Sequence, residues 1–411
     1  MKKGQFEARL LLLVTFALVA FGLVMVFSAT SASATLANGD PAYFVKRQIL
    51  YAAFGLVLMF GVARLDYRAL RRLAPPLMLA SIGLLLAVLA IGQAVNGAQR
   101  WLTFGPIVFQ PSELAKLALA IWAASYLARR RAPQTLKELW RPVGLVACLF
   151  CALLLVEPDL GTAIAIVVML AAMLLVAGTP VRPLAAGLGI AAAVGTVAIW
   201  FEPYRRARVF SFLNPWHDAQ GAGYQTVQAI IGIGSGGIFG RGLGQSVEKA
   251  NFLPEAHTDM IFAIIGEELG LVGAAAVIAA YAVFAYVGLR IALRCKDPFG
   301  KRLAAGVTVL VCGQAAINLA AVMGLAPLTG IPLPFVSYGG SSLVVALVSV
   351  GILLNIATGD AGTGRRAVPD RSRRNGRSRA AVARGGGGAR RSRSAGDVRR
   401  VAGSRRSAAR S

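Results

Sequence analysis

The N-terminal region contains the stretch LLLLVTFALVAFGLVMVF, residues 10–27, in which no charged side chain interrupts the apolar run. A helix needs roughly 20 mostly apolar residues to cross about 30 Å of hydrocarbon, so this stretch predicts a membrane-spanning helix. The whole chain supports that interpretation, since 56% of its 411 residues are hydrophobic, 15% are charged and the mean hydropathy is +0.65. Such a chain has too little polar surface to cover a soluble globule.

Apolar segments of similar length recur along the chain, and we expect ten of them to cross the membrane as helices. They are residues 10–27, 43–62, 73–91, 112–127, 143–156, 161–177, 184–200, 260–289, 303–325 and 338–357. The predicted fold is therefore an all-α polytopic membrane protein. An alternative for the first segment is a cleaved secretory signal, since Ala32-Ser33-Ala34 resembles a cleavage site, but its apolar run exceeds the about 7–15 residues of such signals.

Basic residues flank the predicted helices alternately: they precede the first helix and follow the second, fourth, sixth and eighth. Because Lys and Arg are retained on the cytoplasmic side of a membrane, both termini are predicted to be cytoplasmic. The long connection between the seventh and eighth helices, residues 201–258, is then a large extracytoplasmic loop.

The hydrophobic pattern ends at residue 358, which divides the chain into a membrane domain, residues 1–358, and a tail, residues 359–411. The tail contains sixteen arginines and three aspartates. It has too few apolar residues to fold, so we expect it to be disordered. A polybasic segment beside a membrane is attracted to anionic lipid by about 1 kcal/mol per basic residue. We therefore favour a membrane-surface or partner contact for the tail and expect no nucleic-acid binding.

The four cysteines and two histidines do not indicate a metal site. Cys148 and Cys151 form a CxxC pattern inside a predicted helix, where no second pair or nearby histidine completes a zinc site. We expect these cysteines to serve packing and predict no zinc.

The stretch LPEAHTDMIF, residues 253–262, places Asp259 at the mouth of the predicted eighth helix. An acidic side chain is costly at a membrane edge and is a functional hypothesis there by default. The alternative is that Thr258 or Asp259 only caps the helix. A cap alone does not account for the basic and glycine-rich segment that precedes it, so we favour a functional Asp259.

Two features of the same outer loop suggest an anion site. Arg205, Arg206 and Arg208 lie on the side where basic residues are disfavoured, and clustered guanidinium groups bind phosphate oxygens. The alternative is that long loops escape the charge rule. Seven glycines within residues 232–244 indicate either a flexible loop or a ligand cradle, and no Gly-Lys-Ser/Thr follows to make a P-loop.

Three further segments carry candidate residues. Glu113 and Lys116 are three residues apart at the start of the fourth predicted helix, where an ion pair serves either packing or substrate contact. Residues 327–342 contain prolines, glycines and serines, and irregular backbone at membrane depth indicates a cavity or protein packing. Glu157 and Asp159 are weaker candidates for the same cavity.

With these motifs the chain resembles the SEDS family (shape, elongation, division and sporulation) over roughly residues 10–357. The matching stretches are QPSELAK (110–116), EPDLGT (157–162), LPEAHTD (253–259), GEELG (266–270) and PFVSYGGSS (334–342). Met260 stands where many relatives carry Phe. The GEELG stretch favours the division type of the family over the elongation type.

The resemblance implies a peptidoglycan glycosyltransferase that polymerises lipid II at the outer face of the bacterial cytoplasmic membrane, for septal wall synthesis. Asp259 would be the general base in an inverting transfer. Basic residues would bind the pyrophosphate of the donor, with or without a divalent cation such as Mg²⁺ or Mn²⁺. Alternatives are an elongation-type polymerase, a lipid II flippase and a non-catalytic scaffold.

The resemblance also implies a class B penicillin-binding protein as transpeptidase partner, together with other divisome proteins, and a location at the division septum. The candidate substrate-binding residues are Arg205, Arg206, Arg208, Lys249, Glu255, His257, Glu113, Lys116, Ser337 and Ser341.

Overall fold

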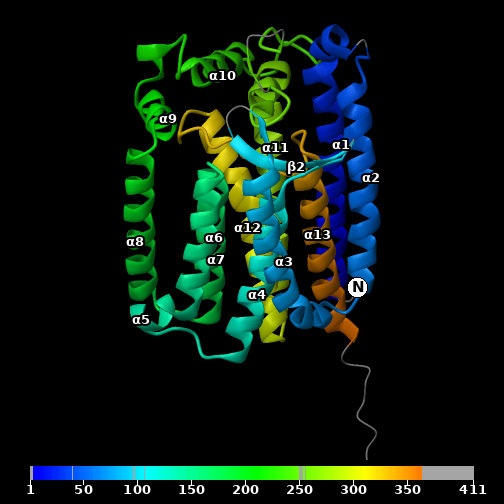
Figure 1. The fold of residues 1–411 in the computed structure, drawn as a ribbon. Coiled ribbons are helices and arrows are strands. Elements are labelled where there is room, and N and C mark those ends of the chain that lie inside the picture. The colour runs from blue at the N-terminus through cyan, green and yellow to red at the C-terminus, as the bar shows by residue number, and fades with distance from the viewer. Residues whose placement is uncertain are drawn as a thin grey trace, which may run out of the picture. The chain divides into compact units, whose positions relative to one another are not determined.

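The computed structural model describes residues 3–38, 40–95, 98–105, 107–249, 253–254 and 256–362, which form a bundle of helices (Figure 1). The helices are α1 (Lys3–Asn38), α2 (Tyr43–Arg64), α3 (Leu70–Ile91), α4 (Pro111–Arg129), α5 (Leu136–Leu139), α6 (Leu145–Val156), α7 (Leu160–Ala177), α8 (Val181–Trp200), α9 (Pro203–Leu213), α10 (Tyr224–Ser235), α11 (Ile261–Arg294), α12 (Pro298–Val322) and α13 (Gly340–Gly362). Short helical turns occupy Tyr67–Ala69, Trp140–Gly144 and Pro215–Asp218. The predicted all-α membrane fold is confirmed.

Nine helical segments of the described chain are long and apolar enough to cross a membrane. The predicted fourth segment is the exception, because Glu113 and Lys116 lower the hydropathy of α4. This helix packs against α3, α7 and α12. Protein rather than lipid therefore surrounds its polar side chains, and α4 does not need the apolar surface of a lipid-facing helix. The predicted fifth segment begins earlier than expected, since α5, the turn after it and α6 form one span, Leu136–Val156.

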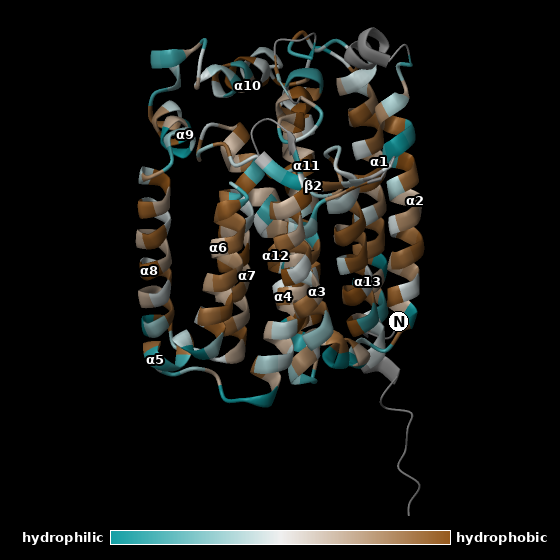
Figure 2. Ribbon diagram, in the orientation of Figure 1, coloured by the Kyte–Doolittle hydropathy of each residue, from teal (hydrophilic) through white to brown (hydrophobic). Residues whose placement is uncertain are grey.

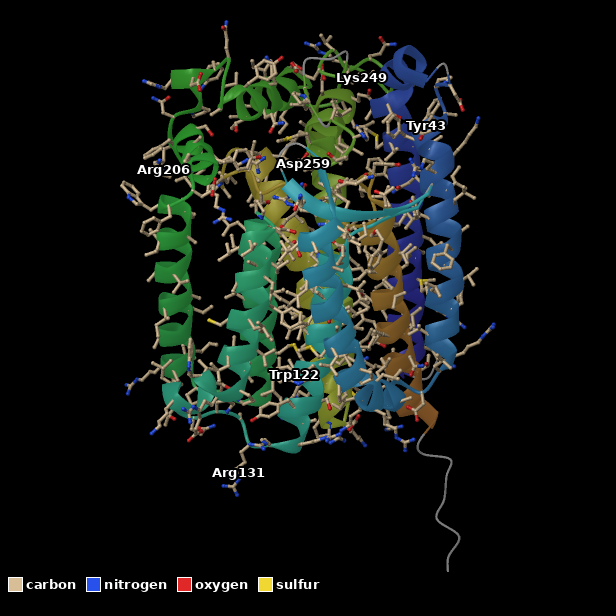
Figure 3. All side chains as sticks on the ribbon, viewed as in Figure 1. Tyr43, Trp122, Arg131, Arg206, Lys249 and Asp259 are labelled. Carbon is tan, nitrogen blue, oxygen red and sulfur yellow. The ribbon has the colours of Figure 1, made fainter. Side chains whose placement is uncertain are left out.

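The distribution of apolar residues matches a membrane orientation. Hydrophobic residues fill the middle of the bundle and hydrophilic ones gather at both ends (Figure 2). The start of α1 and the end of α13 lie at one end of the bundle (Figure 1), as the predicted topology requires. Arg131 lies at that end as well, and Asp259 lies near the opposite end (Figure 3). We call the end that contains Asp259 the outer end, following the charge-based prediction.

The core is centred on α12, which packs against α4, α7 and α11, while α13 packs against α1 and α2. In contrast, α8 stands at the edge of the bundle and contacts α5, α7 and α9. The last helix, α13, continues to Gly362, four residues beyond the predicted domain boundary. The remainder of the predicted tail lies outside the described residues.

A small antiparallel sheet, which the sequence did not predict, covers part of the outer end (Figure 1). Its strands are β1 (Gln93–Val95), β2 (Ala98–Phe104) and β3 (Ile107–Phe109), in the order β1-β2-β3. Leu102 pairs with Phe109 in the register of β2 and β3. The sheet occupies the connection between α3 and α4 and carries Arg100 toward the site described below.

Gly270 interrupts α11 nine residues after the helix begins. Its backbone angles, φ +65° and ψ −161°, lie in a region that is essentially restricted to glycine. Residues 261–269 therefore form a separate helical piece at the outer end, and Asp259 lies two residues before the first residue of this piece.

Candidate active site

A cavity of about 1250 Å³ opens at the outer end of the bundle. Its walls come from α2, the small sheet, α4, α7, α9 and α10, together with the segments that precede α11 and α13. Four of the candidate catalytic and substrate-binding residues line this cavity: Asp259, Arg208, Glu113 and Ser341. The structure thus brings together residues that are far apart in the sequence.

The centre of the site is the space above Gly330, which also lines the cavity. A Cβ atom on Gly330 would lie 3.9 Å from Asp259 Oδ2, 3.9 Å from Arg208 Nη1 and 4.0 Å from Arg100 Nη1. One carboxylate and two guanidinium groups therefore surround a single point. Gly330 has a φ of +70°, a backbone conformation that favours glycine.

Hydrogen bonds hold both the backbone and the side chain of Asp259 in place. Asn318 of α12 donates from Nδ2 to the Asp259 carbonyl oxygen at 2.7 Å and to the Ile331 carbonyl oxygen at 2.8 Å. The hydroxyl of Thr258 donates to Asp259 Oδ1 at 3.1 Å. These bonds fix the Asp259 segment relative to the segment that contains Gly330, while the half-buried carboxylate faces the cavity.

The two arginines are anchored through backbone carbonyl groups. Arg208 lies on α9, donates from Nη1 to the Leu328 carbonyl oxygen at 3.1 Å, and stacks 4.7 Å from the ring centroid of Tyr204. Arg100 lies on β2 and donates from Nε to the Glu157 carbonyl oxygen at 3.0 Å. Neutral carbonyl acceptors orient both guanidinium groups without cancelling their charge.

Sequence reasoning missed Arg100, and it also missed Arg47, which lines the cavity from α2. Arg100 lies in a connection predicted to face outward, and Arg47 lies near the outer end of the predicted second helix, so basic residues at the outer face were a signal for both. We applied that signal only to the loop that contains Arg205, Arg206 and Arg208.

Glu113 and Lys116 form a buried ion pair with a 2.8 Å separation between Nζ and Oε1, and their side chains are 3% and 1% exposed. Glu113 lines the cavity, whereas Lys116 lies behind it. Asp159 also lines the cavity and caps α7 by accepting hydrogen bonds from Thr162. The ion pair with Lys116 keeps Glu113 in place next to the cavity.

The serines of the last predicted motif lie in different surroundings. Ser341 lines the cavity, and its hydroxyl joins α13 to the sheet by donating to the Val108 carbonyl oxygen at 3.1 Å. Ser337 is buried, and its Oγ accepts a hydrogen bond from Leu333 N at 2.8 Å. Ser337 thus shapes the backbone before α13 rather than the cavity surface.

Four other predicted residues are described by the structure and lie outside the cavity lining: Arg205, Arg206, Lys249 and His257. Arg205 donates to the carbonyl oxygens of Leu155 at 2.5 Å and Ala198 at 3.1 Å. The guanidinium of Arg206 lies 6.0 Å from the ring centroid of Trp200.

His257 packs between aromatic rings, 4.8 Å from that of Phe44 and 5.5 Å from that of Tyr338. Lys249 forms an ion pair with Glu268 at 3.0 Å. Glu255, the remaining candidate, lies outside the described residues.

Comparisons with known proteins place this geometry in a family. A family model described as a cell cycle protein (FtsW, RodA, SpoVE) matches residues 8–361. The chain belongs to the FtsW, RodA and SpoVE family. The resemblance indicated by the five sequence motifs is therefore confirmed.

Individual members of the FtsW, RodA and SpoVE family show how far the likeness extends. The chain is 42% identical over 356 residues to a probable peptidoglycan glycosyltransferase FtsW of Geobacter metallireducens, covering 86% of this chain and 95% of that protein. It resembles one chain from a solved structure of a peptidoglycan synthase complex that coordinates polymerisation and crosslinking, with a TM-score of 0.72, 32% identity and coverage of 86% of this chain and 98% of that chain. The rod shape determining protein RodA of Thermus thermophilus matches with a TM-score of 0.63, 30% identity and coverage of 85% and 95%.

Four carboxylate side chains line the cavity, and carboxylate oxygens are ligands that divalent cations bind. They belong to Asp259, Asp159, Glu113 and Glu202. Among the described residues, no group of three or more His, Cys, Asp or Glu side chains is arranged to hold a metal ion. Positive charge at the centre of the site comes instead from the guanidinium groups of Arg100 and Arg208.

Glu157 is a buried carboxyl group beside the cavity, in the turn between α6 and α7. Its side chain is 0% exposed, and within the described chain neither carboxyl oxygen has a hydrogen-bond partner. Burial raises the pKa of Glu157 to about 8; the nearby Asp159 also raises it, and Arg100 lowers it. The carboxyl group is therefore mostly protonated at neutral pH.

We expect Glu157 to make the protein less stable as the pH rises from about 5 to 8. In this range the folded protein holds a proton that the unfolded chain, with an ordinary pKa of 4.5, has released. Glu157→Gln removes the titration, so its Tm should fall less across the range than that of the wild type. The exposed Glu138 provides a control, and Glu138→Gln should keep the wild-type slope. Equal slopes for the wild type and Glu157→Gln would contradict the assignment.

Proposed function

We propose that the protein is a peptidoglycan glycosyltransferase that polymerises lipid II for cell-wall synthesis in cell division. Relatives about 40% identical over most of the chain bear the name probable peptidoglycan glycosyltransferase FtsW. The observation that carries the proposal at atomic level is the meeting of Asp259, Arg100 and Arg208 around Gly330 in one outer cavity.

A glycosyl transfer needs a group that accepts a proton and groups that stabilise a negatively charged leaving group, and the carboxylate and the two guanidinium groups of the site suit these two tasks. The reaction forms a bond between the acceptor's sugar hydroxyl oxygen and the anomeric carbon of the donor, and it breaks the bond from that carbon to pyrophosphate. Asp259 accepts the proton of the attacking hydroxyl as general base. The bonding electrons leave with the pyrophosphate, whose negative charge is stabilised by Arg100 and Arg208. Attack on the face opposite the leaving group inverts the configuration at the anomeric carbon.

The anchoring of these groups favours this reaction. Carbonyl acceptors orient Arg100 and Arg208, and Asn318 fixes the backbone of Asp259. Charged groups that are already in place before the substrate binds lose little energy to reorganisation during the reaction. The site therefore has the preorganisation that a glycosyltransferase requires.

The position of the cavity suits a lipid-linked donor. Asp259, which lines the cavity, lies near the outer end of the bundle (Figure 3), and hydrophobic residues fill the middle of the bundle (Figure 2). A lipid chain can remain in the membrane while its pyrophosphate and sugars enter the cavity. We place the reaction at the outer face of the cytoplasmic membrane, and we assign the protein to the division septum.

A transpeptidase of the class B penicillin-binding type is the partner that we propose. The similar solved structure is a synthase complex that coordinates polymerisation with crosslinking. A glycan strand emerging from the outer cavity would be available to such a partner on the same side of the membrane. Other divisome proteins would bring the pair to the septum.

We expect Asp259→Asn to abolish polymerisation while the protein remains folded. The amide cannot accept the hydroxyl proton, and general bases contribute about 10²–10⁴-fold to the rate. The assay is formation of glycan chains from purified lipid II, with the transpeptidase partner present, resolved on a gel. Asp40→Asn is the control, because Asp40 is a partly exposed outer-end residue paired with Lys46. Wild-type turnover by Asp259→Asn would remove Asp259 as the base.

We also expect Gly330→Ala to lower the turnover on the order of 10²-fold, because small displacements of reacting groups have effects of this size. The added methyl group would occupy the point that Asp259, Arg100 and Arg208 surround. Gly178→Ala is the matched control, since Gly178 has a φ of +98° and a Cβ added there would meet no neighbouring atom within 4 Å. Similar losses of Tm in both variants, with a loss of turnover in Gly330→Ala alone, would support the site. Equal turnover in both would contradict it.

A further inference from the structure

The GEELG motif, residues 266–270, has no part in the cavity described above. Glu267 and Glu268 lie at the end of the first helical piece of α11 and are 1% and 0% exposed. Two adjacent carboxylates are costly to bury unless each has a charged partner and hydrogen bonds. Both conditions are met, and the partners show what the motif does.

Glu268 joins three parts of the chain. Its Oε1 lies 3.0 Å from Nζ of Lys249, whose side chain is 9% exposed. The hydroxyl of Ser28, near the outer end of α1, donates to the two carboxylate oxygens at 2.8 and 2.6 Å. The Lys249–Glu268 pair is thus enclosed by protein and linked to the first helix.

Glu267 binds the preceding loop through a separate set of contacts. Arg241 donates from Nη1 to Glu267 Oε1 at 3.2 Å. The Ser246 hydroxyl donates to Oε2 at 2.5 Å, and the Val247 amide donates to Oε1 at 3.0 Å. The loop before Lys249 is therefore fixed to α11 by side chains.

The backbone of the glycine-rich run adds to this attachment. Arg241 N donates to the Glu267 carbonyl oxygen at 3.0 Å, and Leu271 N donates to the Gly237 carbonyl oxygen at 2.9 Å. A Cβ on Gly240 would overlap the Glu268 carbonyl oxygen, so only glycine permits this approach. The glycine run packs against the break in α11, and the ligand-cradle interpretation is not needed to account for it.

The Lys249–Glu268 pair closes a loop that contains Asp259 near its middle. Lys249 lies ten residues before Asp259, and Glu268 lies nine residues after it. Joining the two ends of a segment reduces the number of positions that its centre can take. Asn318 fixes the same segment at Asp259 itself, so the pair and Asn318 restrain it at three points.

We propose that Lys249 and Glu268 are positioning residues for Asp259: their ion pair clamps both ends of the segment that carries the base. This inference rests on the proposed function, in which Asp259 accepts the proton of the acceptor hydroxyl. It gives Lys249 a role that differs from the pyrophosphate contact expected from the sequence. The pair acts through the backbone and does not contact the substrate.

The kinetic test compares Lys249→Met, Glu268→Gln and the reversed pair, Lys249→Glu with Glu268→Lys, in lipid II polymerisation. Misplacing the base should lower kcat on the order of 10²-fold and leave KM for lipid II unchanged. The reversed pair should recover part of the lost kcat. An increase in KM with unchanged kcat would indicate substrate contact by Lys249 and would overturn the proposal.

A second ion pair separates positioning from general stability. Arg294 of α11 pairs with Glu7 of α1, whose side chain is 5% exposed, and neither residue belongs to the site. Arg294→Met should lower the Tm as Lys249→Met does, while its kcat remains near that of the wild type. If kcat falls equally in both variants, the Lys249–Glu268 pair has only a structural role.

Hydrogen–deuterium exchange provides a readout that does not depend on activity. Amides of residues 253–265 should exchange faster in Lys249→Met than in the wild type, and not in Arg294→Met. Unchanged exchange in Lys249→Met would overturn the proposal even if the variant were inactive. Absence of polymer from the wild-type protein would instead count against the proposed function, and exchange would still decide whether the pair restrains the Asp259 segment.

Discussion

The side-chain amide of Asn318 is the contact on which the geometry of the site depends. Its Nδ2 donates to the carbonyl oxygens of Asp259 and Ile331, at 2.7 and 2.8 Å. Both carbonyls belong to irregular segments near the membrane edge, where lipid offers no hydrogen bonds and an unpaired backbone group is costly. A single residue of the central helix α12 thus fixes the carboxylate of Asp259 relative to Gly330. The arginines can converge on that point only because these two segments are held together.

The partners of the charged side chains at the outer end follow from the same cost of burying polar groups away from water. Lys116 and Lys249, whose side chains are largely enclosed by protein, are each paired with a buried carboxylate, Glu113 and Glu268, because a lone buried charge is strongly unfavourable. Arg100 and Arg208 are half-buried and hydrogen-bonded to neutral carbonyl oxygens beside a large cavity. Their charge remains available to an anionic ligand. The protein therefore uses basic residues of its outer face in two ways, to fix loops and to create a positive cavity.

Much of the fold could be predicted from the sequence, because a membrane helix leaves a strong signal in apolar length. The exception, α4, is surrounded by protein and so carries Glu113 and Lys116 where a lipid-facing helix would be apolar. Asp259 was predictable from its place before a helix at the outer face. The structure places Arg208 beside it and directs Arg205 toward the Leu155 carbonyl oxygen. The sequence alone cannot tell which of several arginines in one loop reaches the site, because that depends on tertiary contacts. Arg100 was missed for a different reason. It lies on β2, and the strands of this sheet are too short to leave a clear alternating pattern in the sequence. Only the folded sheet brings it to the cavity, next to the Glu157 carbonyl oxygen.

The most direct test of the account is a structure of the protein with bound lipid II or with its undecaprenyl pyrophosphate product, determined by electron cryo-microscopy. We expect density for the pyrophosphate between the guanidinium groups of Arg100 and Arg208, above Gly330. With lipid II, the sugar hydroxyl of the acceptor should lie within hydrogen-bonding reach of Asp259. Pyrophosphate held elsewhere, for instance by Arg205 and Arg206 outside the cavity, would contradict the account.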